Sequence, residues 1–167
     1  RLADARSYLE AALTIYREVG QRQAEAIART NLGLLCCTEE RLEEATSQFD
    51  TALAIAREVG QQSLEGIILG GLASVSQARG ELARAREHCE AALSIHRATK
   101  NERLIGSTLG TSASLFHRQG DTAAARDALT AGEQLLRQTR WDLELGKLLC
   151  VRAELEHGAG NVEAARA

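Results

Sequence analysis

The chain has 167 residues, of which 44% are hydrophobic and 26% charged, and its formal net charge is −3. This balance argues against intrinsic disorder, and the longest apolar stretches fall far short of the roughly 20 residues that a membrane-spanning helix needs. With no Pro and only 3% aromatic residues, the composition also argues against a β-sandwich or a β-barrel.

The sequence repeats itself with a constant period of about 40 residues. The segment from Ala12 to Gly20 (ALTIYREVG) returns as Ala52 to Gly60 (ALAIAREVG). Two further columns share this period: alanines at positions 5, 45, 85, 125 and 165, and glycines at positions 80, 120 and 160, with Glu40 as the odd member of the second column. Several columns with one period and no insertions indicate an array of structural repeats.

Apolar residues recur at helical spacing within each unit, so we predict two helices per unit. In chain order the predicted helices cover residues 2–18, 22–38, 42–58, 62–79, 82–98, 102–119, 122–138 and 141–158, and a further one begins near Val162. Glycines such as Gly20 and Gly120 follow helix ends, where a left-handed conformation closes a helix without a Cβ penalty. Asp121 and Asn161 follow such glycines and are suited to cap the next helix.

One such helix pair cannot bury its apolar face alone, so we expect the pairs to stack into an all-α solenoid. The expected units of this single array are residues 1–20 (partial), 21–60, 61–100, 101–140 and 141–167 (partial). Small residues occupy the positions where helices must approach closely, namely Gly33, Ala73, Ala113 and Ala153 in first helices and Ala45, Ala85 and Ala125 in second helices. Because the chain begins with Arg and opens on a second helix, we expect it to be part of a longer protein.

The two helices of a unit carry a recurring pattern of small and bulky residues. It reads Leu32-Gly33 then Ala45-x-x-x-Phe49-x-x-Ala52, next Leu72-Ala73 then Ala85-x-x-x-Cys89-x-x-Ala92, and next Ser112-Ala113 then Ala125-x-x-x-Leu129. The pattern resembles that of the tetratricopeptide repeat family, although the family's aromatic columns and closing Pro are missing and its usual unit is shorter, with about 34 residues. It is similar to the branch with longer helices, found in spindle-orientation scaffolds and in helical arms of bacterial multidomain regulators. The resemblance implies a right-handed superhelix that binds proteins or peptides.

The resemblance also implies that the first helices line a concave groove. By alignment, the residues expected to point into it are Ile27, Thr30, Asn31, Leu34, Ile67, Gly70, Gly71, Ser74, Gln77, Ser107, Thr111, Ser114, His117, Arg118, Lys147, Glu154 and His157. This set grades from apolar to polar and partly cationic, which favours an amphipathic partner segment with an acidic end. Alternatively, the small residues in it serve only tight coiling of the array. The Lys and Asn residues of the family's carboxylate clamp are missing, and of the scaffold branch's asparagine ladder only Asn31 is present.

Candidate motifs for chemistry are incomplete, so we predict neither catalysis nor a cofactor. Residues 110–114 (GTSAS) resemble a nucleophile elbow without its last Gly, and residues 88–90 (HCE) resemble a zinc-deaminase motif without its CxxC partner. Near the ends of successive first helices lies a column formed by Cys37, Gln77, His117 and His157. His117 and His157, together with Cys150, could hold a metal; the alternative is that they are polar groove residues.

Arginines recur at the ends of the second helices, at positions 17, 57, 97 and 137. A cation there complements the helix dipole. These arginines could also pair with Glu25 or Glu65 of the following helix, or contact an acidic partner.

From these features we predict a protein- or peptide-binding scaffold module that acts as an interaction arm of a larger signalling or regulatory protein. The alternatives are a domain that senses a ligand or signal peptide, and a metal-binding protein. Acidic and basic residues are spread along the whole chain, so neither nucleic acid nor a membrane is an expected partner. The lack of a signal peptide and of any CxxC pair among four cysteines favours the cytoplasm. Terminal helices without polar caps would allow copies to stack end to end.

Overall fold

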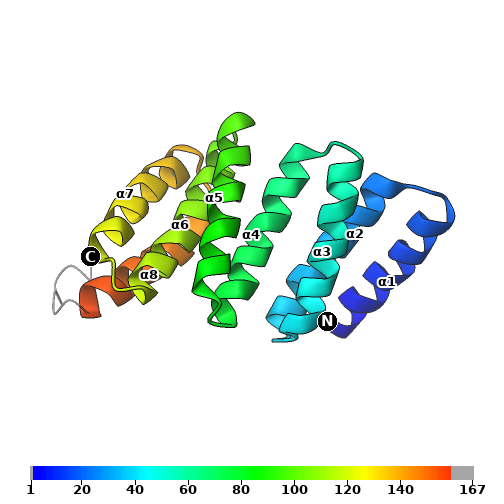
Figure 1. The fold of residues 1–167 in the computed structure, drawn as a ribbon, viewed down its shortest axis with the longest axis horizontal. Coiled ribbons are helices and arrows are strands. Elements are labelled where there is room, and N and C mark those ends of the chain that lie inside the picture. Colours follow the sequence, from blue (N-terminus) through cyan, green and yellow to red (C-terminus); the bar gives the residue numbers. More distant parts are fainter. Residues whose placement is uncertain (1, 159–167) are drawn as a thin grey trace. The chain divides into compact units, whose positions relative to one another are not determined.

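The computed structural model describes residues 2–158, and these form eight α-helices and no strand (Figure 1). The helices are α1 (Leu2–Glu18), α2 (Arg22–Thr38), α3 (Leu42–Glu58), α4 (Gln62–Ala78), α5 (Leu82–Ala98), α6 (Glu102–Arg118), α7 (Thr122–Gln138) and α8 (Asp142–Gly158). The predicted bounds are confirmed to within one residue at each end. The predictions at Gly160, Asn161, Val162 and Ala165 fall outside the described residues.

Between residues 2 and 158, each connection contains three residues and closes the preceding helix in the same way. After α1, the N–H of Gly20 donates to the Arg17 carbonyl and the N–H of Gln21 donates to the Tyr16 carbonyl, at 3.3 and 2.8 Å. This pair of bonds is a Schellman motif, which requires a left-handed residue at its centre. Glycine fills that position at residues 20, 60, 80 and 120, with φ from 70 to 81°, whereas Glu40, Lys100 and Arg140 adopt it at 53 to 58°.

Side chains cap the starts of α6 and α7. Asp121 Oδ1 accepts a hydrogen bond from the Ala124 N–H at 3.0 Å, which confirms the predicted cap of α7. Asn101 does the same for α6, accepting from the Leu104 N–H at 3.2 Å. Such a bond satisfies one of the backbone donors that a helix start leaves unpaired.

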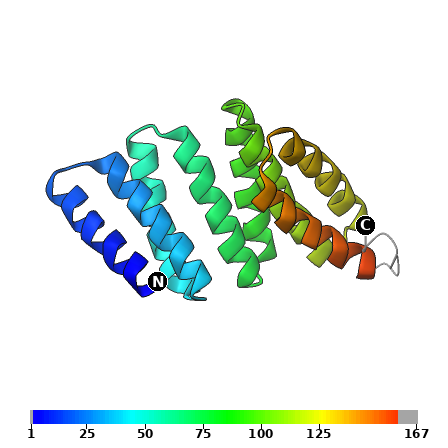
Figure 2. The same ribbon diagram turned by 180° about the vertical axis from the view of Figure 1, so that it is seen from behind.

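The chain divides into two compact units, Arg1–His88 and Cys89–Ala167, with the boundary inside α5. In the first unit, which we call unit 1, α2 packs against α1 and α3, and α4 packs against α3 and α2 (Figures 1 and 2). The core of unit 1 is centred on Phe49, which is fully buried. Its ring lies where Gly33 of α2 and Gly71 of α4 leave room, since a Cβ at either position would come within 2.7 Å of ring carbons.

In the second unit, unit 2, α7 packs against α6 and α8, and α6 packs against α8. Its buried cluster consists of Ala113, Ala125, Ala128, Leu129, Leu136, Leu148 and Leu155. Gly106 and Gly132 allow the close approach, because Cβ atoms there would lie 2.8 Å from side-chain carbons of Leu136 and Leu148 respectively. Consecutive helices thus pack as neighbouring pairs in each unit, which confirms the all-α repeat architecture; the superhelical sense and the single array stay predictions.

Within residues 2–158, none of the helices combines the length and the apolar character that crossing a bilayer requires.

Candidate functional site

The apolar residues predicted to line a groove lie on the surface of unit 1. On α2, Ile27 and Leu34 are 43% and 49% exposed, and Ile67 of α4 is 38% exposed. Asn31 is exposed between the two α2 residues. Thr30 is instead buried, and its hydroxyl donates to the Ala26 carbonyl at 2.8 Å.

These residues line both sides of a hollow between α2 and α4. Its volume is about 350 Å³, near the lower end of the range for ligand pockets, which begins at about 300 Å³. The lining residues are Gln23, Ile27, Thr30, Asn31, Leu34, Gln61, Ser63, Leu64 and Ile67. We call this site the α2–α4 hollow. Five of the predicted groove residues therefore meet in one place.

A second hollow of about 170 Å³ lies between α1 and α2. It is lined by Leu9, Ala12, Tyr16, Ala24, Ile27, Ala28 and Asn31. Ile27 and Asn31 are common to both hollows, so their side chains form the wall that separates them. Four lining residues of the α2–α4 hollow, Gln23, Gln61, Ser63 and Leu64, were not predicted. The prediction considered residues in the middle and at the end of each first helix, whereas these four lie at or near helix starts.

The remaining predicted residues of α4 do not belong to this hollow. Gly71 is buried and faces the Phe49 ring, so its missing side chain serves core packing. Gly70 is half-buried with open space where a Cβ would lie, Ser74 is exposed, and Gln77 is half-buried.

In unit 2 the predicted groove residues are polar and largely accessible. Ser107, Thr111, Ser114 and His117 of α6 are half-buried, whereas Arg118 and, on α8, Lys147, Glu154 and His157 are exposed. Two of them are tied together by Glu144: its carboxylate accepts a hydrogen bond from Ser107 Oγ at 3.0 Å and pairs with Lys147 Nζ at 2.7 Å. Part of this surface is therefore already engaged within the unit.

Charged side chains at the start of α2 are balanced within unit 1. Arg22 pairs with Glu58 of α3 at 2.6 Å and with Glu25 at 2.7 Å, and Glu25, which is only 4% exposed, also pairs with Arg29 at 3.0 Å. Hydrogen bonding from Arg22 lowers the pKa of Glu58 below its ordinary value, so this carboxylate stays ionised at neutral pH.

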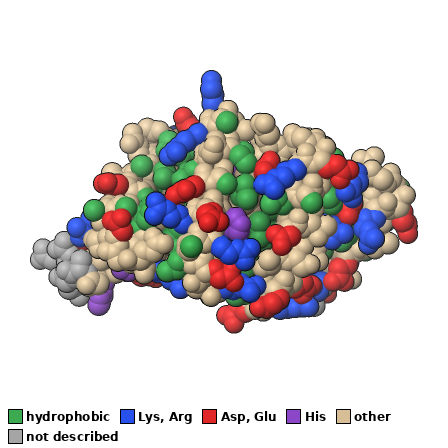
Figure 3. All heavy atoms as spheres, in the orientation of Figure 1, with side chains coloured by type: hydrophobic (Ala, Val, Ile, Leu, Met, Phe, Trp, Pro, Cys, Tyr) green, Lys and Arg blue, Asp and Glu red, His purple; other side chains and the backbone are tan. Residues whose placement is uncertain are grey.

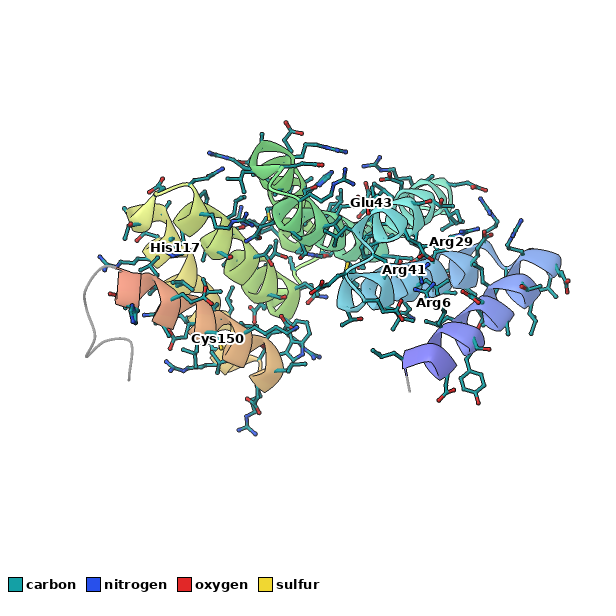
Figure 4. The ribbon with its side chains drawn as sticks, turned by 90° about the horizontal axis from the view of Figure 1, so that it is seen from below. Arg6, Arg29, Arg41, Glu43, His117 and Cys150 are labelled. Carbon is teal, nitrogen blue, oxygen red and sulfur yellow. The ribbon has the colours of Figure 1, made fainter. Side chains whose placement is uncertain are left out.

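A second ionic cluster ties α1 to the α2–α3 pair (Figure 4). Arg6 of α1 donates to Glu39 at 2.5 Å, to Glu44 at 2.8 Å and to the sulfur of Cys36 at 3.3 Å, and Arg41 pairs with Glu44 as well. The hydrogen bond from Arg6 lowers the pKa of Glu39. Because all of these groups find partners within unit 1, the cluster serves to hold the helices together.

The arginine column has mixed surroundings. Arg57 pairs with Glu65 of the following helix at 2.7 Å, as predicted. Glu25 is instead held by Arg22 and Arg29, and Arg137 pairs with Glu133 of its own helix at 2.6 Å. On the face shown in Figure 3, basic and acidic side chains of the described residues are interspersed.

The structure gives the metal hypothesis no support. Among residues 2–158, no group of three or more His, Cys, Asp or Glu side chains lies close enough to hold an ion. Cys150 is exposed on α8, and the His117 ring lies beside the end of that helix, 3.9 Å from where a Cβ of Gly158 would be (Figure 4). Burial raises the pKa of the Cys37 thiol, which belongs to the same column.

The two incomplete enzyme motifs lie within helices. Ser112 is buried in α6 and its hydroxyl donates to the Thr108 carbonyl at 3.0 Å, so the segment is no strand-to-helix elbow. Cys89 is 2% exposed, and burial raises its pKa, as expected of a core thiol.

The comparisons with known proteins agree with this architecture. A family model described as tetratricopeptide repeat matches residues 1–58 and 64–138. No curated protein matches the chain. A solved structure, that of BtubC (BKLC) from P. vanneervenii, is similar with a TM-score of 0.78 and 18% sequence identity, over 99% of this chain and 69% of that one. This likeness shows a shared fold. The chain belongs to the tetratricopeptide repeat family, with units longer than the family's usual length of about 34 residues.

Proposed function

We propose that this chain is a protein- or peptide-binding module and that its partner is seated in the α2–α4 hollow. Repeats of this family generally mediate protein–protein interaction, and the family fold is typically a non-catalytic scaffold. The observation that supports the location is the exposure of Ile27, Leu34 and Ile67 around one concave surface. Aliphatic side chains gathered in a hollow favour burial against a partner, at roughly 25 cal/mol for each Å² removed from water.

In the finer form of this proposal, the module is an arm of a larger regulatory protein of the cytoplasm, carries out no covalent chemistry, and recognises a segment with an acidic end. The acidic end is supported by Arg118 and Lys147, which are exposed in unit 2. The Lys147 ammonium is shared with Glu144, so its attraction for a partner would be weaker than that of a lone cation.

The experiment is a selection of displayed random peptides on the immobilised protein. The diagnostic variant, Leu64→Glu/Ile67→Lys, places two charges in the α2–α4 hollow. The matched control, Ala11→Glu/Thr14→Lys, places the same two charges at the same spacing on exposed positions of α1. Peptides that bind the natural chain and the control but not the diagnostic variant support the proposal. If every selected peptide binds all three proteins equally, the α2–α4 hollow is not the binding site.

A second proposal is that copies of the chain associate through α1 of one copy and α8 of another. Ile15 of α1 is 56% exposed, whereas Ile55, its equivalent one repeat further on, is 2% exposed. On α8, Leu149 is 38% exposed, whereas Leu69, its equivalent two repeats earlier, is 4% exposed. Sedimentation of the natural chain should show association that increases with concentration and that Ile15→Glu abolishes. A monomer at every concentration would contradict this second proposal.

A further inference from the structure

The position of the α2–α4 hollow in unit 1 has an equivalent within unit 2. The sequence period makes α6 and α8 the equivalents of α2 and α4, two repeats further along the chain. The equivalents of the nine lining residues, in the same order, are Arg103, Ser107, Gly110, Thr111, Ser114, Trp141, Leu143, Glu144 and Lys147. Comparison of the two sets shows which properties of the hollow are particular to unit 1.

In unit 2 this position is bridged by side chains. The guanidinium carbon of Arg103 lies 4.5 Å from the centroid of the Trp141 ring, and Ser107 Oγ donates to Glu144 Oε2 at 3.0 Å. Gly110 lies opposite Leu148, and a Cβ there would be 3.6 Å from Leu148 Cδ1, an ordinary van der Waals contact. These contacts join α6 to Trp141, which immediately precedes α8, and to Glu144 of α8.

In unit 1 the same position is open and uncharged. Gln61 stands in place of Trp141, and Leu64 and Ile67 stand in place of Glu144 and Lys147. None of the nine lining residues is ionisable, and the nearby charges of Arg22, Glu25 and Glu58 are paired with one another.

We infer that the α2–α4 hollow selects an uncharged aliphatic side chain of the partner and that its equivalent in unit 2 binds none. This inference rests on the proposed function and adds the chemistry of the residue that is recognised. A charged side chain in the hollow would lose water without gaining a counter-charge, whereas an aliphatic one meets Ile27, Leu34 and Ile67. The neutral side chains of Gln23 and Gln61 in the lining attract neither sign of charge.

The test uses small probes, so it does not depend on knowing the partner. The natural chain is isotope-labelled at the δ1 methyl groups of isoleucine, and N-acetyl-leucine amide, N-acetyl-glutamate amide and N-acetyl-lysine amide are titrated separately. The leucine derivative should shift the Ile27 and Ile67 methyl signals with an affinity at least about tenfold higher than either charged derivative. The methyl signals of Ile95 and Ile105, in unit 2, should stay in place.

Two single variants serve as the matched pair. Leu64→Glu should weaken the leucine derivative by at least about tenfold at Ile27 and Ile67, and Ala11→Glu on α1 should leave it unchanged. Equal affinity for a charged probe, equal shifts in unit 2, or no shift with the leucine derivative would overturn the inference. Failure of this inference can be told apart from failure of the proposed function. Selected peptides that bind in the α2–α4 hollow without preferring an aliphatic residue overturn the inference alone. If no selected peptide depends on the hollow, the proposed function is overturned.

Discussion

Two neighbouring glycines of α4 provide a test of the core packing, because they face opposite surroundings. A Cβ at Gly71 would lie 2.6 Å from Cζ of Phe49, whereas a Cβ at Gly70 would meet no atom within 4 Å. The Phe49 ring has little freedom to move aside, since it is fully buried and a Cβ at Gly33 would approach it to 2.7 Å from the other helix. Alanine at position 71 should therefore strain the core, and alanine at position 70 should not.

The size of the difference follows from two terms. Both substitutions replace a glycine inside a helix and gain about 1 kcal/mol of helix propensity. Carbon atoms in ordinary contact are about 3.5–4.0 Å apart, so Gly71→Ala requires the ring to shift by about 1 Å, and overpacking of this kind costs about 1–3 kcal/mol. Gly70→Ala should raise the free energy of unfolding by about 0.5–1 kcal/mol. Gly71→Ala should lower it by up to about 2 kcal/mol.

The assay is urea unfolding followed by circular dichroism, with both variants compared with the natural chain. The double variant Phe49→Leu/Gly71→Ala should be more stable than the sum of the two single changes predicts. Leucine already fills the equivalent position in other repeats, at Leu9 and Leu129. If Gly70→Ala and Gly71→Ala changed stability by the same amount, the close approach of α4 to Phe49 would be refuted.

Four further predictions concern other parts of the chain. Lys100→Gly should raise the free energy of unfolding by about 0.5–1 kcal/mol in urea unfolding, because Lys100 adopts a φ of 53°, where glycine carries no Cβ penalty. Gly120→Val should lower it by about 1 kcal/mol or more, since a β-branched residue resists the φ of 81° at this position, and an unchanged melting temperature would contradict this. Burial lowers the pKa of His96 below its value in the unfolded chain, so the free energy of unfolding should fall as the pH drops below about 6.5. In unfolding curves measured across pH, His96→Leu should make this dependence on pH weaker. A dependence as steep as that of the natural chain would exclude His96 as its source. The double variant Arg118→Glu/Lys147→Glu should weaken the binding of acidic peptides in a titration. It should not lower the melting temperature, because both side chains are exposed, and a lower melting temperature would show that one of them packs against the fold.

The helices could be predicted almost to the residue because two local signals coincide. Apolar residues keep helical spacing within each unit, and Gly20, Gly60, Gly80 and Gly120 mark the ends. The connections at Lys100 and Arg140 give no such signal, yet they adopt the same left-handed conformation as the glycines. There the fixed helix length and the packing of the pairs impose the turn on residues that do not favour it.

The site was predictable only in part, because alignment gives the position of a residue along a helix but not what covers it. Ile27, Leu34 and Ile67 are exposed and line the α2–α4 hollow, and their role in binding a partner stays a proposal. Asn31 and Gly71 occupy equivalent positions of the repeat. Gly71 is buried because it faces the Phe49 ring, whereas Asn31 is exposed.

The side-chain contacts between α6 and the start of α8 in unit 2 could not be predicted for a different reason. The contacts of Trp141 with Arg103 and of Glu144 with Ser107 join residues far apart in the sequence, on α6 and at or just before the start of α8. Nothing local in the sequence marks these pairs, because they depend on how closely α6 and α8 approach each other. Ser107 carries no mark in the sequence of its hydrogen bond to Glu144, and the pairing is visible only once the helices are in place.

The most direct measurement is the pattern of nuclear Overhauser contacts between a selected peptide and the methyl groups of the protein. We expect contacts from one aliphatic side chain of the peptide to the methyl groups of Ile27, Leu34 and Ile67. Contacts confined to unit 2, or to the outer faces of α1 and α8, would contradict it.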